Sequence, residues 1–74
     1  MEFVQLQGIG KKPGKPAREL RPGDVIIWNY GYKSTVILAT PSKTGKTIDA
    51  LLLSHDTGAT RARKLGAGRL VAVA

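Results

Sequence analysis

The spacing of turn residues is the feature that most constrains the fold of this chain. From Leu20 onward, short runs rich in β-branched and aromatic residues are each closed by turn-forming residues, at intervals of about ten positions. Such spacing favours short strands joined by tight turns, and no helix of normal length is predicted. The sequence therefore predicts an all-β domain, built as a small sandwich or barrel.

Five strands are predicted after Leu20, covering residues 25–29, 32–40, 46–54, 59–64 and 69–73. Residues 29–31 (Asn-Tyr-Gly) and 56–58 (Asp-Thr-Gly) form tight reversals, because each ends in a glycine that accepts a positive φ. Residues 65–68 are predicted to be a single irregular turn.

Side-chain alternation divides each predicted strand into two faces. Three apolar sets each share a face: Val25 with Ile27, Val36 with Leu38, and Ile48 with Ala50 and Leu52. In the predicted strand 59–64, Arg61 and Arg63 are assigned to the solvent-exposed face, because charged side chains are rarely buried without a partner. Their neighbours Thr60 and Ala62 are then expected to point inward. Closing the sheet into a barrel would hide its edges and bury the apolar sets.

The start of the chain differs from the rest. Apolar and polar side chains alternate along residues 3–7, which predicts a short strand with Val4 and Leu6 facing inward. Residues 8–22 instead mix glycines and prolines with lysines and arginines. Because proline removes a donor and glycine adds backbone entropy, residues 8–22 are predicted to be a flexible basic loop, not a helix or a central strand. The chain is thus expected to be one domain over 1–74, with a strand and flexible loop over 1–19 and a barrel over 20–74.

Composition narrows the class of protein. Hydrophobic residues make up 42% and charged residues 23% of the 74 residues, as in ordinary folded domains. Without cysteine, neither a disulfide nor a thiolate zinc site can stabilise the fold. No apolar run approaches the roughly 20 residues of a membrane span, and the N-terminus lacks the pattern of a signal peptide. We therefore expect a soluble, cytoplasmic protein without a membrane partner.

The charge is strongly positive: twelve lysines and arginines against five aspartates and glutamates give a formal net charge of +7. Such a surface attracts phosphate backbones, anionic membranes or acidic proteins. The candidate nucleic-acid-binding residues are Lys11, Lys12, Lys15, Lys33, Lys43, Lys46, Arg61, Arg63, Lys64 and Arg69. The aligned pair Arg61 and Arg63 suits bidentate contact with phosphate oxygens. The alternative for this pair is an edge strand that its charges protect from aggregation.

Three aromatic residues, Trp28, Tyr30 and Tyr32, surround the first predicted reversal next to Lys33. Rings beside positive charge are what single-stranded nucleic acid needs, because bases stack on the rings while phosphates meet the charge. The alternative is that Trp28 packs in the core and the tyrosines only border it. A peptide-binding groove would use the same rings.

No catalytic or metal site is predicted. Residues 42–47 end like a phosphate-binding loop, but Thr40 occupies the place of its first glycine and a strand follows instead of a helix. His55 has no second histidine or cysteine to complete a metal site, and no motif places a base beside a serine. We expect a protein that is not an enzyme and has no cofactor.

The run from Leu20 to Val25 (Leu-Arg-Pro-Gly-Asp-Val), Gly31, the apolar residues 36–38 and the closing segment 69–73 together resemble a small SH3-like barrel of the KOW or Tudor type, with five or six strands. The resemblance covers residues 20–73. It implies binding of RNA or of ribosomal and transcription components for KOW barrels, of modified peptides for Tudor barrels and of polyproline peptides for SH3 domains. The segment GDVIIWNYGY also resembles small uncharacterised proteins of actinobacterial bacteriophages.

The sequence thus favours a non-catalytic, small basic barrel that binds DNA or RNA through its basic loops and a basic strand face. The alternative is a protein-interaction module that binds a host or phage protein through Trp28 and Tyr32, for example a phage-encoded effector in the host cytoplasm. A structural role in a virion or an oligomer is the third hypothesis.

Overall fold

Hairpins make up most of residues 2–74, which are the residues that the computed structural model describes. The strands are β1 (Glu2–Leu6), β2 (Gly10–Pro16), β3 (Val25–Ile27), β4 (Lys33–Pro41), β5 (Thr47–Ser54), β6 (Thr60–Gly66) and β7 (Leu70–Val73), with the 3-10 turns η1 (Ala17–Glu19) and η2 (Asn29–Gly31). All neighbouring strands are antiparallel, so the all-β class is confirmed. Within residues 2–74, no helix has the length and apolar character needed to cross a membrane.

The five strands predicted after Leu20 all form, with ends shifted by a few residues. β3 ends two residues earlier than predicted, at Ile27. β6 ends two residues later, at Gly66, so the turn expected at residues 65–68 is confined to residues 67 and 68. Gly66 pairs with Thr47 of β5, and Leu65 pairs with Ile48. The ladder with β5 therefore extends the strand beyond the point where the local sequence suggests a turn.

Residues 10–16 form β2, so the predicted flexible loop at residues 8–22 is wrong. β2 pairs with β1 through Gly10 to Gly14 and with β7 through Gly14 to Pro16. Pro13 and Pro16 each lie where β2 has a ladder partner on one side only, and a strand tolerates proline at such positions. Pairing with distant strands thus overrides a local sequence that disfavours regular structure.

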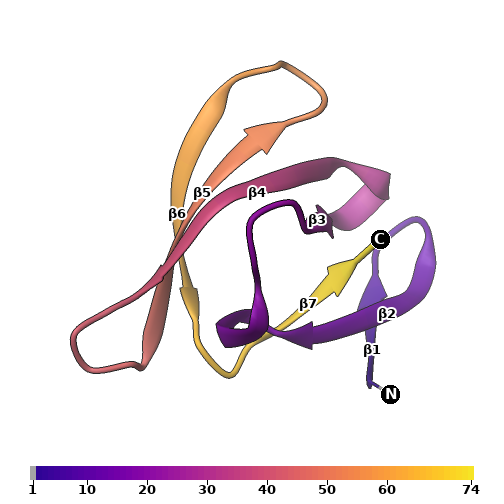
Figure 1. The fold of residues 1–74 in the computed structure, drawn as a ribbon. Coiled ribbons are helices and arrows are strands. Elements are labelled where there is room, and N and C mark those ends of the chain that lie inside the picture. The colour runs from indigo at the N-terminus through magenta and orange to yellow at the C-terminus, as the bar shows by residue number, and fades with distance from the viewer. Residues whose placement is uncertain (1) are drawn as a thin grey trace.

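The strand order is β1-β2-β7-β3-β4-β5-β6, which is an open sheet of seven strands. The ladders of residues 2–74 do not join the end strands β1 and β6, so they differ from the closed barrel of five or six strands that the sequence suggested. β3 pairs with both β4 and β7 and links two groups of strands. Figure 1 shows β4, β5 and β6 running together on one side of β3 and β1, β2 and β7 on the other.

The main core lies on one face of the sheet, called the inner face below. Its buried members are Ala17, Leu20, Ile26, Val36, Ile48, Ala50, Leu52, Leu65, Ala67 and Val71. The shared inward face of Ile48, Ala50 and Leu52 is as predicted. Ile27 packs in a smaller cluster with Leu6 and Ala72, because consecutive strand residues point to opposite faces. β3 is therefore buried on both of its faces.

A β-bulge in β4 separates Val36 from Leu38, which the sequence placed on one face. Val36 pairs with Leu52, but Leu38 pairs with Leu51 instead of Ala50, so one extra residue, Ile37, lies between the two registers. Val36 is buried at 1% exposure, whereas Leu38 is 54% exposed. The extra residue reverses the alternation after Val36 and turns Leu38 to the outer face.

Arg61 and Arg63 of β6 are exposed as predicted, but the prediction that Thr60 and Ala62 point inward is wrong. Arg61 pairs with Leu52 and Arg63 with Ala50, so both arginines lie on the inner face, in line with buried Leu65. Their neighbours Thr60 and Ala62 are exposed on the outer face. Because β6 is an end strand, its arginine stems can extend along the margin of the core while their charged ends stay in water.

Candidate functional site

Arg61 and Arg63 border a groove at the margin of the core, beside the turn that joins β5 and β6. The groove has a volume of about 390 Å³. We call it the arginine groove and define it by Trp28, Ser34, Leu52, Ser54, Arg61 and Arg63. Ser34 and Ser54 are ladder partners on β4 and β5, and Trp28 directly follows β3. Residues from four strand regions thus meet at this place.

Trp28 forms one wall of the arginine groove, and its ring contacts both Ser34 and Arg63. Its indole Nε1 donates a hydrogen bond of 3.0 Å to Oγ of buried Ser34. The guanidinium carbon of Arg63 lies 4.5 Å from the centroid of the ring, which is the geometry of a cation–π contact. The ring is partly buried and packs against the main core. Trp28 is therefore both a core residue and a groove residue, which the sequence left as alternatives.

Neither groove arginine forms an ion pair with a carboxylate in the described range, residues 2–74. Among residues 2–74, the one ion pair joins Lys15 to Asp24, on a different part of the sheet. No acidic residue lines the groove. Asp49 pairs in the ladder with Lys64, on the outer face of β5 and β6. The arginine groove therefore presents two positive charges that form no ion pair within residues 2–74, which favours the binding of an anion.

A second basic group forms at the other end of the β4–β5 hairpin. Lys43 and Lys46 lie in its turn, and the Lys46 carbonyl accepts a hydrogen bond of 2.9 Å from the N–H of Ala67. Ala67 begins the short turn between β6 and β7, and Arg69 directly follows that turn. Arg18 belongs to the same group, because its N–H donates to the Ala67 carbonyl at 3.0 Å. Arg18 was missing from the candidate residues, since only the fold brings η1 to this turn.

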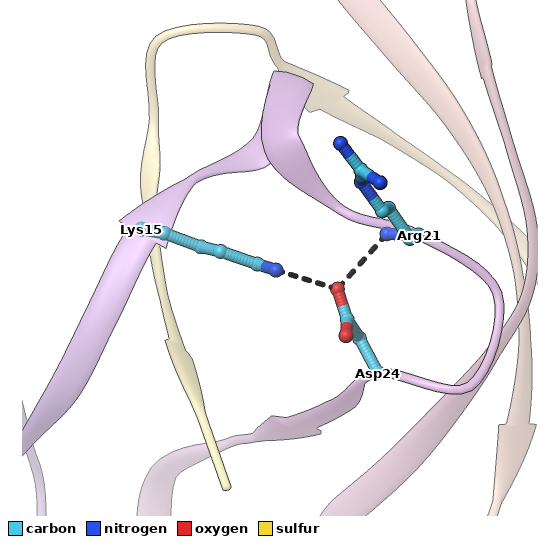
Figure 2. Close-up of polar contacts among 3 residues, drawn as sticks. All are labelled: Lys15, Arg21 and Asp24. Carbon is cyan, nitrogen blue, oxygen red and sulfur yellow. Dashed lines mark hydrogen bonds and ion pairs between the residues drawn. The ribbon is translucent and has the colours of Figure 1, made fainter.

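The N-terminal lysines are spread along β2. Lys11 is exposed and Lys12 is half-buried. Lys15 Nζ contacts Asp24 Oδ2 at 2.7 Å, as Figure 2 shows, so its charge is partly neutralised. These lysines do not line the arginine groove. Lys64 points to the outer face of β6, away from Arg61 and Arg63.

The three aromatic residues are not on one surface. Tyr30 is 66% exposed, but its hydroxyl donates to Gln7 Oε1 at 3.0 Å and its N–H donates to the Gln7 carbonyl at 2.7 Å. This contact holds Tyr30 at a positive φ of 64°, against the β1–β2 turn. Tyr32 is 55% exposed and lines a shallow hollow with Lys33, His55 and Asp56. Only Trp28 faces the arginine groove.

His55 contributes to the hairpin structure. Its Nε2 lies 2.6 Å from Thr35 Oγ1, and its N–H donates to the Lys33 carbonyl at 3.0 Å. No group of three or more metal-binding side chains occurs within the described part of the chain, residues 2–74. The chain matches no protein-family model, and no curated protein or solved structure is significantly similar to it. The geometry of the site therefore carries the functional argument alone.

Proposed function

We propose that this protein is a non-catalytic nucleic-acid-binding domain that holds phosphates of DNA or RNA at the arginine groove. The observation that supports this function best is that Arg61 and Arg63 lie side by side on the inner face and have no carboxylate partner among the described residues. A guanidinium group matches phosphate oxygens in a bidentate way and stays charged at every physiological pH. The net charge of +7 would further attract a polyanion from a distance.

The second basic group would add phosphate contacts that do not depend on sequence. Arg18, Lys43, Lys46 and Arg69 surround two neighbouring turns at the end of the sheet away from the arginine groove. A polyanion long enough to reach both sites would gain affinity from each. We therefore expect affinity to rise with the length of the oligonucleotide until both sites are filled.

Binding to labelled oligonucleotides at several salt concentrations tests the proposal. R61Q is expected to weaken binding about tenfold and to reduce the log–log salt slope by about one, because one phosphate contact is lost. R21Q is the matched control, since Arg21 is exposed, lies outside the arginine groove and carries the same charge. An equal loss in R61Q and R21Q would show that only net charge matters. Binding that is indifferent to salt would exclude the proposed function.

A second candidate function is the binding of an acidic protein segment. β6 is an end strand, and six of its seven residues are exposed, so an extended segment could pair with its free edge while its carboxylates meet Arg61 and Arg63. A pull-down from host lysate with and without nuclease separates the two functions. A host or phage protein that survives nuclease treatment with wild type and is lost with R61E would favour the second; loss of all captured material on nuclease treatment favours the first.

We further propose that the sheet is a variant of the small SH3-like barrel. The tight turn at Gly31 between β3 and β4 and the successive hairpins β4–β5–β6 support this relation. The added strands β1 and β2 would then be an extension specific to this chain.

A further inference from the structure

The contact between Trp28 and Arg63 suggests which kind of nucleic acid the arginine groove would hold. Arg63 lies over the ring of Trp28, and Ser34 fixes the ring from its edge. The indole therefore has a defined orientation before any ligand binds. Its partner Arg63 is an exposed side chain that forms no ion pair within the part of the chain that the structure describes. The hydrogen bond to Ser34 therefore orients the ring, whereas the cation–π contact is the one interaction described for the Arg63 guanidinium within residues 2–74.

We propose that Trp28 is a base-stacking platform that Arg63 covers in the free protein, and that the ligand is a single-stranded nucleic acid. This inference rests on the proposed nucleic-acid-binding function and names its substrate class. On binding, one base replaces the guanidinium over the indole, and Arg63 turns to the neighbouring phosphate. The cation–π contact is exchanged for base stacking and for a charge-assisted hydrogen bond.

The spacing of the arginines supports a single extended strand. Arg61 and Arg63 are two residues apart on β6, so their Cα atoms are separated by about 6.6 Å along the strand. One backbone lying along β6 would therefore meet both guanidinium groups in succession. The groove, at about 390 Å³, has the size of a small-ligand pocket and admits a single base rather than the width of a duplex.

A duplex does not offer the unpaired base that would stack on Trp28. Its bases are already stacked on one another, and a base must be unpaired and turned out before it can lie on an indole. A duplex would therefore contact Arg61 and the second basic group through its phosphates but leave Arg63 over Trp28. The two ligands should differ in their effect on Trp28, even where both bind.

Intrinsic fluorescence measures this difference directly, because Trp28 is the single tryptophan of the chain. The wild-type protein is titrated at fixed salt with oligo(dT) of about 12 nucleotides, within the range of single-stranded site sizes, and with a duplex of equal length. We expect oligo(dT) to quench the Trp28 emission and the duplex to leave it unchanged. We also expect W28L to weaken oligo(dT) binding about tenfold, the effect of losing one stacked base, and duplex binding less than twofold.

The outcomes separate this inference from the proposed function. Equal binding of both ligands without a change in Trp28 emission would overturn the stacking platform and leave nucleic-acid binding intact. Quenching by the duplex to the same extent would also overturn it. Absence of binding to either ligand would remove both proposals. The fluorescence measurement needs no variant, so it decides the question even if W28L fails to fold.

Discussion

Lys15 Nζ lies 2.7 Å from Asp24 Oδ2 and ties β2 to the turn that precedes β3 (Figure 2). The same carboxylate oxygen accepts a hydrogen bond of 2.9 Å from the N–H of Arg21. Partial burial favours the neutral acid, but the hydrogen bonds from Lys15 and Arg21 and their positive charges outweigh it, so the pKa of Asp24 is lowered. A residue of the predicted flexible loop is therefore part of a fixed contact.

The first prediction concerns the pH dependence of stability. Because the pKa of Asp24 is lower in the folded state, its ionised form stabilises the fold above about pH 4, and this contribution is lost as the pH falls through the folded pKa. D24N should lower the free energy of unfolding at pH 7 by about 0.5–1.5 kcal/mol, a small effect because water screens a pair whose side chains are 30% and 29% exposed. Denaturant unfolding between pH 7 and pH 3 measures both effects.

D56N is the control for this experiment, because Asp56 is an exposed turn residue with no ion pair within residues 2–74. The acid-induced loss of stability should be smaller in D24N than in wild type and should remain unchanged in D56N. Identical pH profiles for D24N and wild type would show that the Lys15–Asp24 contact contributes nothing to folding.

The second prediction tests the packing of β2 at Gly14, where both of its ladders meet. A Cβ atom at Gly14 would lie 2.5 Å from Val4 Cγ2 and 2.9 Å from the Val71 carbonyl oxygen. Because the carbonyl belongs to the backbone of β7, the sheet would have to shift to admit it. G14A should therefore reduce the free energy of unfolding by about 1–3 kcal/mol in denaturant titrations.

G66A serves as the matched substitution, since Gly66 also lies in a strand and neither glycine has a positive φ. The nearest atom to a Cβ at Gly66 is Arg69 Cβ at 3.8 Å, an ordinary contact. Its stability should change by less than about 0.5 kcal/mol. If G14A and G66A unfold at the same denaturant concentration as wild type, β2 does not pack between β1 and β7 as described.

Turns were predictable from the sequence because their chemistry is local. Gly31 and Gly58 end the two predicted reversals, and both have a positive φ, of 87° and 72°. β2 was not predictable in this way, because Pro13 and Gly14 disfavour a strand locally and only the ladders with β1 and β7 stabilise one. Local propensity is a weak guide where pairing comes from residues far along the chain.

The site was predictable in its residue types but not in its geometry. The sequence identified Arg61, Arg63 and Trp28 as candidates, and it correctly placed the two arginines on one face of a strand. It assigned that face to water, and both arginines are exposed, but the register with Leu52 places them on the same side of the sheet as the main core. The contact of Arg63 with Trp28 joins residues 35 positions apart, and no local pattern indicates it.

The last prediction tests the bulge in β4 by comparing alanine substitutions at Leu65 and Leu38. Leu65 of β6 is 1% exposed in the main core, whereas Leu38 follows the bulge and is 54% exposed on the outer face. L65A should cost about 2–5 kcal/mol of unfolding free energy because it leaves a cavity. L38A should cost less than about 0.5 kcal/mol, since little apolar surface is buried there. Simple alternation would instead bury Leu38 beside Val36, so comparable losses in the two variants, measured by denaturant unfolding, would show that β4 runs without the bulge.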